Sequence, residues 1–222
     1  MSVFFGVRKP IAPAPDLPTG DDFSEGISNW TAYASDADAT MDWYQSNSLR
    51  LNINTGITSE QDRIQAVWAY GITGDFDIEV GYLRTNFGTV GAGRNYNWGL
   101  GVSTTNTSSL PDNIISPLWI ADKSLMRSVY VLGGATQDST DNTTKPSDPT
   151  IANLRLRITR VGTTFTTYHD PSTGSWSQIA QHSASSFNGV MYPYFSSFRF
   201  GNTAVGVKFT NFLVNSGTVV EP

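Results

Sequence analysis

Residues 153–179 read NLRLRITRVGTTFTTYHDPSTGSWSQI, and this stretch decides the fold class. From Leu154 to Thr159 apolar and polar side chains alternate, which is the period of a strand that is buried on one face only. A Val-Gly pair turns the chain, and a run rich in Thr and Tyr leads from Phe165 to His169. A DPSTG turn precedes a third run from Trp176 to Ile179. The stretch therefore predicts three antiparallel strands joined by short turns.

The rest of the chain favours a single all-β domain. The 222 residues can bury a substantial core, and no window has a convincing helical period. Further strands are expected at 49–53, 63–70, 76–83, 96–103, 125–132, 190–200 and 205–214. Two long polar connections, 104–117 and 133–149, interrupt this rhythm and are expected to be functional loops, disordered segments or crossovers between sheets.

Charge and cysteine content exclude several classes of function. With 14 basic and 19 acidic residues the net charge is −5, and the arginines are scattered along strands, so nucleic acid is not expected as a partner. The chain has no cysteine, which excludes disulfides and thiolate chemistry. No apolar stretch is long enough to span a membrane, so no membrane partner is expected either.

The first twenty residues differ from the rest, and we expect them to form an extended arm ahead of a domain at 21–222. Four prolines, Pro10, Pro13, Pro15 and Pro18, favour a polyproline-like conformation. The segment lacks the apolar core of a signal peptide. The candidate residues for assembly are Phe4, Phe5, Arg8 and Pro10. Two interpretations stay open: the arm docks on a neighbouring subunit, or it lies along its own domain.

Five motifs follow one another along the chain. They are DDFSEG at 21–26 with Trp30, GDFDIEV at 74–80, GLGV at 99–102, LRLRITRVG at 154–162 through to Trp176, and VKFTNF at 207–212. In this order they resemble the concanavalin A-like lectin/glucanase superfamily, nearest to its laminin-G-like and xylosidase-C-terminal-like domains. The resemblance implies a jelly-roll sandwich of two curved antiparallel sheets, with the first strand beside the last. It implies little about chemistry, because this fold carries lectins, hydrolases, adhesion modules and viral proteins.

One strand carries the strongest hint of catalysis. Alternation places Asp75, Asp77 and Glu79 on one face, and the resemblance implies a Glu, Asp, Glu motif of similar spacing in laminarinase-like glucanases. Retaining glycosidases need two carboxylates about 5 Å apart, whereas residues four apart on a strand are too distant unless their side chains converge. The alternative is an ordinary strand opening with exposed carboxylates, and we predict no catalytic residue.

Other chemistry has weaker support. The histidines, His169 and His182, are expected at the surface, and no serine in a nucleophile elbow accompanies them, so a catalytic triad is not expected. Asp36, Asp38 and Asp42 offer oxygen ligands for Ca²⁺ but lack the glycine and the distal glutamate of an EF-hand loop. A solvated acidic loop is the preferred interpretation, and no cofactor or metal is predicted.

Alternating aromatic residues suggest a surface for sugars. Trp68 and Tyr70 share one strand face, and Tyr96 and Trp98 share another; Tyr192 and Tyr194 form a third such pair. The apolar face of a sugar stacks on exposed rings of this kind. The alternative, which carries more weight, is that these rings fill the interior of a sandwich without disulfides.

Three hypotheses of function result. The first is a non-catalytic structural or decoration subunit on the surface of a virus or phage particle, anchored through its arm to other subunits and forming a homo-oligomer. The second is a carbohydrate-binding module or lectin used for adhesion to a surface glycan, which could coexist with the first hypothesis. The alternative to a location on the virion surface is an extracellular one. The third is a glucanase-like hydrolase that uses Asp75 and Glu79. We prefer the first, because it accounts for the arm and for the lack of a convincing active site.

Overall fold

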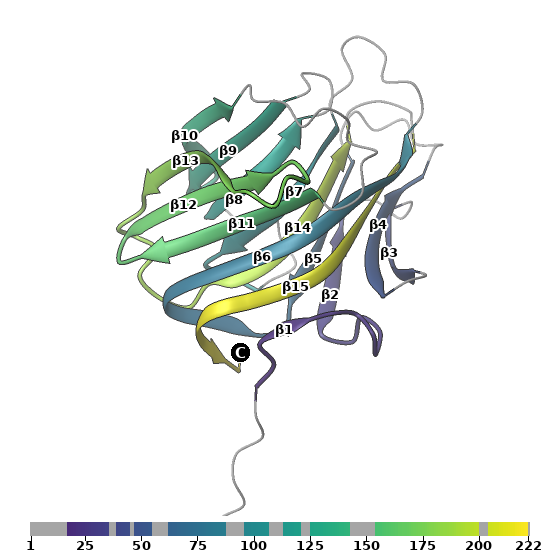
Figure 1. Cartoon of the computed structure of the whole chain (residues 1–222), viewed down its shortest axis with the longest axis horizontal. Helices are drawn as coiled ribbons and strands as arrows, with labels where there is room; N and C mark the ends of the chain where they lie inside the picture. The colour runs from purple at the N-terminus through teal and green to yellow at the C-terminus, as the bar shows by residue number, and fades with distance from the viewer. Residues whose placement is uncertain are drawn as a thin grey trace, which may run out of the picture.

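Two antiparallel β-sheets account for the part of the chain that the computed structural model describes (Figure 1). This part comprises residues 17–35, 39–44, 47–54, 62–87, 96–106, 113–120, 125–142, 154–199 and 204–221. These residues form strands, turns and irregular segments, and no helix occurs among them. They therefore contain no helix that could cross a membrane. The predicted all-β jelly-roll sandwich is confirmed.

The first sheet, called sheet A, has the meander at one edge. Its strand order is β13 (Ser177–Ser183), β12 (Thr164–Asp170), β11 (Leu154–Val161), β6 (Gly71–Phe87), β15 (Val205–Val220), β4 (Ser48–Ile53) and β3 (Ala39–Tyr44), and β1 (Gly20–Asp21) also pairs with β15. The three strands predicted from residues 153–179 are thus confirmed. Gly162 makes the first turn with a φ of 59°, a conformation that glycine adopts without strain.

The second sheet, called sheet B, lies behind sheet A in Figure 1. Its strand order is β10 (Ala135–Asn142), β9 (Leu125–Leu132), β8 (Ile114–Ile120), β7 (Tyr96–Ser103), β14 (Tyr192–Arg199), β5 (Asp62–Trp68) and β2 (Trp30–Ala34). All neighbouring strands run antiparallel in both sheets.

The first strand pairs with the last, as the resemblance implied. Gly20 lies opposite Leu213 and Asp21 lies opposite Phe212. The Asp21 carboxylate accepts a hydrogen bond of 2.9 Å from the Trp30 indole, which joins the start of the domain to its core. Gly20 belongs to the sheet, so the described structure of the domain begins before residue 21.

Two predicted loops contain strands, which corrects the expectation of long polar connections at 104–117 and 133–149. β8 begins within the first and carries Pro117, a residue that argues against a central strand. β10 lies within the second and has no apolar alternation. It is the edge strand of sheet B, where backbone pairing with β9 and an ion pair between Arg127 and Asp141 hold it. Strands β2 and β3 were also not predicted.

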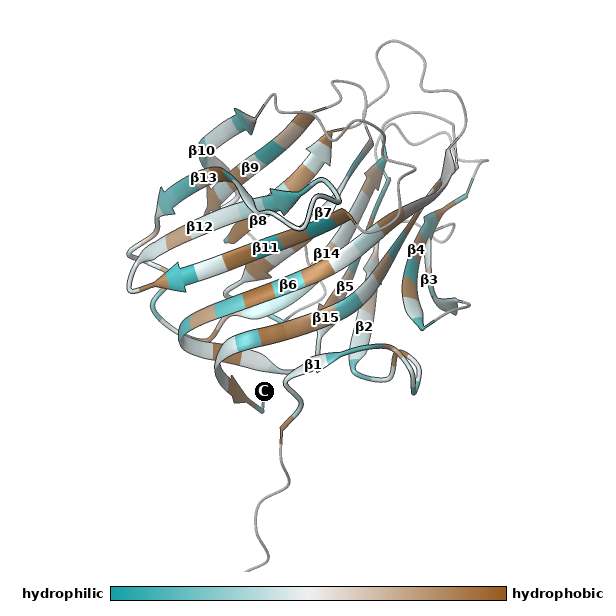
Figure 2. Cartoon of the chain, viewed as in Figure 1, coloured by the Kyte–Doolittle hydropathy of each residue, from teal (hydrophilic) through white to brown (hydrophobic). Residues whose placement is uncertain are grey.

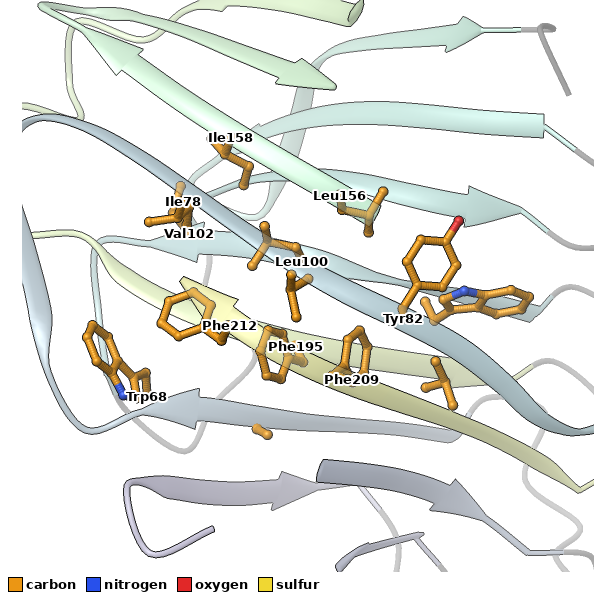
Figure 3. Close-up of a cluster of buried hydrophobic side chains, with 14 of the residues drawn as sticks. Trp68, Ile78, Tyr82, Leu100, Val102, Leu156, Ile158, Phe195, Phe209 and Phe212 are labelled. Carbon is orange, nitrogen blue, oxygen red and sulfur yellow. The ribbon is translucent and has the colours of Figure 1, made fainter. Parts of the chain in front are cut away.

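The core lies between the sheets and is rich in aromatic rings. Apolar residues alternate with polar ones along β6, β11 and β15 (Figure 2), and the apolar set points inward. Figure 3 shows Leu156 of β11 and Leu100 of β7 from opposite sheets in this layer. Phe195 stacks on Phe209 with ring centroids 4.4 Å apart. Truncating a fully buried ring of this kind costs about 3–5 kcal/mol.

Candidate functional site

The outer face of sheet B is hollowed into a cleft of 280 Å³. Four adjacent strands, β5, β14, β7 and β8, form its floor and walls. The lining residues are Arg63 and Gln65 of β5, Asn97 of β7, Ile114, Ser116 and Leu118 of β8, and Tyr194, Ser196 and Phe198 of β14. Because side chains alternate along a strand, the intervening residues such as Ile64 and Phe195 are buried in the core.

Small residues lie side by side at the centre of the cleft and leave room there. The register places Ser196 of β14 between Gln65 on one side and Gly99 on the other. A Cβ atom at Gly99 would collide with the backbone oxygen of Pro117, so glycine permits the close approach of β8. At Gly101 the missing side chain leaves the room that the Tyr194 ring occupies.

An aromatic ring and a cation form one wall. Phe198 lies opposite Arg63 on β5 and opposite Asn97 on β7. The Arg63 guanidinium carbon is 5.2 Å from the centroid of the Phe198 ring, within the range of a cation–π contact. Burial lowers the pKa of Arg63, because the guanidinium has lost part of its water. This wall therefore combines an apolar surface with a partly dehydrated positive charge.

Polar atoms in the cleft differ in how far their hydrogen bonds are satisfied. The Ser116 hydroxyl donates a hydrogen bond of 2.6 Å to the Leu100 carbonyl. Tyr194 is only 2% exposed, and burial raises the pKa of its hydroxyl, so that the group is neutral. The Asn97 side-chain oxygen is buried without any hydrogen-bond partner. An acceptor of this kind is costly to leave unpaired and suits a ligand that donates a hydroxyl proton.

No carboxylate lines the cleft among the residues that the structure describes. Acid/base hydrolysis of a glycosidic bond requires a pair of carboxyl groups on either side of that bond. The cleft therefore offers surface and hydrogen bonds for binding, but no acid/base pair.

The carboxylates predicted as a catalytic alternative lie elsewhere, on the outer face of sheet A. Asp77 forms two hydrogen bonds with the Arg157 guanidinium. Glu79 lies 3.4 Å from Arg155 and accepts a hydrogen bond of 3.1 Å from Asn215. Asp75 and Glu79 are two strand periods apart, about 13 Å along β6. These carboxylates therefore lie on one face of the strand, as alternation predicted. On that face Asp77 and Glu79 form ion pairs with arginines.

Arg155 and Arg157, which form this cluster with Asp77 and Glu79, also lie over an aromatic ring. The guanidinium carbons of Arg155 and Arg157 lie 4.6 Å and 5.5 Å from the Trp176 ring centroid. Arg155 also binds Asp170. Burial opposes ionisation of Asp170, but hydrogen bonds from Arg155 and Thr173 outweigh it and keep the pKa of this carboxyl below its ordinary value. Both arginines of this cluster therefore have carboxylate partners.

Both histidines are buried, which corrects the expectation that they lie at the surface. His169 and His182 are each 1% exposed. His182 Nε2 lies 2.7 Å from the Ser128 hydroxyl, and its Nδ1 lies 2.8 Å from Asp138. This is the connectivity of a serine triad, but Ser128 is completely buried in the sandwich, where no substrate reaches it. The trio links β13 of sheet A to β9 and β10 of sheet B.

The predicted sugar platform is wrong at its two tryptophans. Trp68 and Trp98 are fully buried, so neither presents a ring face to a ligand. Trp68 packs edge-on against Phe212, and Tyr70 is half-buried beside the same core. Tyr96 is the first residue of β7, and its side chain lies outside the described part. Both tryptophan rings fill the interior between the two sheets.

The candidates for calcium binding and for the assembly arm lie largely outside the described residues. Asp36 and Asp38 lie outside the described residues, and Asp42 pairs with Arg50 across β3 and β4. Among the described residues no group of three acidic or histidine side chains is placed to hold a metal ion. The arm residues Phe4, Phe5, Arg8 and Pro10 lie outside the described part, as do all of residues 1–16.

Sequence reasoning missed the cleft residues. Strand alternation would have placed Arg63 and Gln65 on the solvent side of β5, and Ser196 and Phe198 on the same side of β14. Cross-strand register is what brings them together with Asn97, and a single sequence contains no direct signal for that register.

The fold and the site define a class, a two-sheet jelly roll with a polar and aromatic cleft on one outer face. No protein-family model matches the chain, and no curated protein matches it in sequence. Solved structures do match. A β-glucanase of Bacillus licheniformis has a TM-score of 0.60 at 11% identity, over 89% of this chain and 97% of the glucanase.

Two further structures are proteins whose names refer to carbohydrate. A Bauhinia forficata lectin in complex with GalNAc has a TM-score of 0.54 at 12% identity, over 89% of this chain and 98% of the lectin. A carbohydrate-binding module of Bacillus subtilis has a TM-score of 0.53 at 16% identity, over 86% of this chain and 97% of the module. The likenesses establish a concanavalin A-like jelly-roll fold. The predicted place on a virus particle stays a prediction.

Proposed function

We propose that the protein binds carbohydrate through the cleft on the outer face of sheet B and performs no hydrolysis there. The observation that carries the proposal is the buried, unpartnered Asn97 side-chain oxygen in a cleft that also holds the Phe198 ring. Sugars present both hydroxyl donors and apolar C–H faces, which such a pair complements. Similarity in fold to a lectin and to a carbohydrate-binding module supports the proposal.

The arrangement of the lining residues matches this chemistry. Ile114 and Leu118 supply apolar surface at β8, and Phe198 supplies a ring at β14. Gln65 and Ser196 lie on the floor between them. The volume of 280 Å³ is close to the lower end of the range of about 300–1,000 Å³ for ligand pockets, which suits a short glycan segment.

Two observations favour binding without hydrolysis. The described lining of the cleft contains no carboxylate. Of the two carboxylates of the alternative, Asp75 accepts a hydrogen bond from the Gly162 backbone N–H, and Glu79 is engaged by Arg155. We therefore expect no release of reducing ends from β-glucan, and activity that Glu79→Gln abolishes would favour the hydrolase hypothesis instead.

A substitution that fills the cleft tests the proposal. Ser196→Trp places an indole between Gln65 and Gly99, in the hollow itself. We expect glycans that bind the native protein on an array to lose affinity at least about tenfold in calorimetry. Ser177→Trp, at a half-exposed serine of sheet A, is the matched control and should bind as the native protein does. The proposal fails if no glycan binds the native protein or if both variants bind equally well.

A further inference from the structure

We propose that the preferred sugar is acidic and that its carboxylate binds Arg63; this inference rests on the proposed carbohydrate-binding function. Arg63 is the one charged residue among the described residues that line the cleft. Its backbone is fixed on both sides, because β5 pairs with β14 and with β2. A cation held in a binding cleft selects the charge of the ligand.

Arg63 differs from other arginines of the protein in its surroundings. Five of them form ion pairs with carboxylates: Arg50 with Asp42, Arg127 with Asp141, Arg155 with Asp170, Arg157 with Asp77, and Arg199 with Asp62. Arg160 donates to the backbone carbonyls of Gly162 and Gly189 instead. Among the described residues Arg63 has no carboxylate partner, and its charged group faces the Phe198 ring.

This lack of a counter-ion makes an anionic ligand favourable. Partial burial has removed water from the guanidinium, and burial lowers its pKa, so the charge gains more from an anion here than at the surface. The titratable side chain beside it in the cleft, Tyr194, is neutral because burial raises its pKa. The protein carries a net charge of −5, so the positive cleft is a local exception.

The row of residues across the sheet indicates how the sugar lies. Arg63, Phe198 and Asn97 occupy neighbouring positions on β5, β14 and β7. A sugar ring on Phe198 therefore has the cation on one side and the unpaired Asn97 acceptor on the other. A planar carboxylate accepts two parallel hydrogen bonds from the guanidinium fork, and a ring hydroxyl donates to Asn97.

Two sugars that differ in their charge provide the test of this inference, and both are measured against the full chain. The probes are an oligogalacturonate and its methyl ester, which differ in the charge of the carboxyl group. By calorimetry we expect the acid to bind at least about tenfold more tightly than the ester, with the difference shrinking as salt is added. Galactose 6-sulfate and galacturonate, compared as monosaccharides, separate carboxylate from sulfate recognition.

Variants at the cleft assign the preference to Arg63. Arg63→Gln should reduce the ratio of acid to ester affinity to about one, and Arg63→Lys should retain part of it. Asn97→Asp adds a negative charge to the cleft, on the other side of Phe198 from Arg63, and should weaken binding of the acid selectively. This variant provides a second route if Arg63→Gln does not fold. Arg127→Gln, on the same sheet but outside the cleft, is the control and should keep the native ratio.

The outcomes distinguish this inference from the proposed function. Equal affinity for acid and ester, tighter binding of the sulfate, or an unchanged ratio in Arg63→Gln overturns the acidic-sugar inference and leaves carbohydrate binding intact. The same holds if neutral glycans bind on the array and galacturonates do not. Absence of binding to every glycan overturns both.

Discussion

At the scale of single residues, the shape of the cleft depends on side chains that are absent. Gly101 lies beneath the Tyr194 ring, and Gly99 lies against the backbone of β8. Both have neighbours that would occupy the space of a Cβ atom. Because the interior of a protein is closely packed, a single added methyl group must move the ring or the strand.

Gly101→Ala is therefore expected to destabilise the protein by about 1–3 kcal/mol and to push Tyr194 into the cleft. Urea unfolding measures the free energy of unfolding, and glycan binding should weaken in parallel. The control is Gly189→Ala, where a Cβ atom would meet nothing within 4 Å. This variant should stay within about 0.5 kcal/mol of the native protein, and an equal effect of the two substitutions would contradict the packing argument.

Burial of His169 gives the stability of the protein a dependence on pH. Burial lowers the pKa of this histidine in the folded state, and neither ring nitrogen has a hydrogen-bond partner. Below the ordinary pKa of about 6.5 the unfolded chain takes up a proton that the folded chain resists. Stability should therefore be complete above pH 6.5 and fall towards pH 5, by at most about 1.4 kcal/mol per pH unit from this group.

Urea unfolding of His169→Leu between pH 5 and 8 isolates this contribution. In the variant the free energy of unfolding should depend less on pH, because the contribution of His169 is gone. At pH 7.5 it should stay close to that of the native protein, since leucine needs no hydrogen-bond partner in the core. Identical slopes in the two proteins would show that His169 titrates with an ordinary pKa.

At the scale of elements, alternation predicted the meander well because its three strands have clear polar and apolar faces. The same signal failed for β10, whose residues are polar on both faces and which depends on pairing with β9. His169 follows Phe165 and Thr167 at intervals of two on the buried face of β12, so period two could have revealed it. His182 was harder to predict, because a bulge between β12 and β13 shifts the register just before it.

His182 joins the free edges of the two sheets, and its removal should loosen them. His182→Leu leaves the buried Ser128 hydroxyl without a partner, at a cost of about 1–3 kcal/mol. We expect faster amide hydrogen exchange in β10 and β13 and unchanged exchange in β4, at the other end of sheet A. Gln181→Leu, an exposed neighbour on β13, is the control. Uniform acceleration throughout the sandwich would contradict a local link.

At the scale of the whole molecule, the outer faces of the two sheets differ in how their charges are satisfied. On sheet A, Arg155 and Arg157 are paired with acidic residues of the same face. On sheet B, Arg63 lines the cleft and has no such partner among the described residues. Under the proposed function the cleft of sheet B binds the ligand, whereas Arg155 and Arg157 of sheet A already have carboxylate partners on their own face.

The predicted role of the arm in assembly is also a property of the whole molecule. Deletion of residues 1–16 keeps Thr19 and Gly20, which bond to β15, so the sandwich should melt within a few degrees of the native protein. If Phe4, Phe5 and Arg8 dock on neighbouring subunits, the full chain should elute as an oligomer and the truncated chain as a monomer in size-exclusion chromatography with light scattering. Phe4→Ser with Phe5→Ser should reproduce the loss, because burial of apolar side chains drives such docking. An oligomer that survives deletion would assign assembly to the sheets, and a monomeric full chain would remove the arm from assembly altogether.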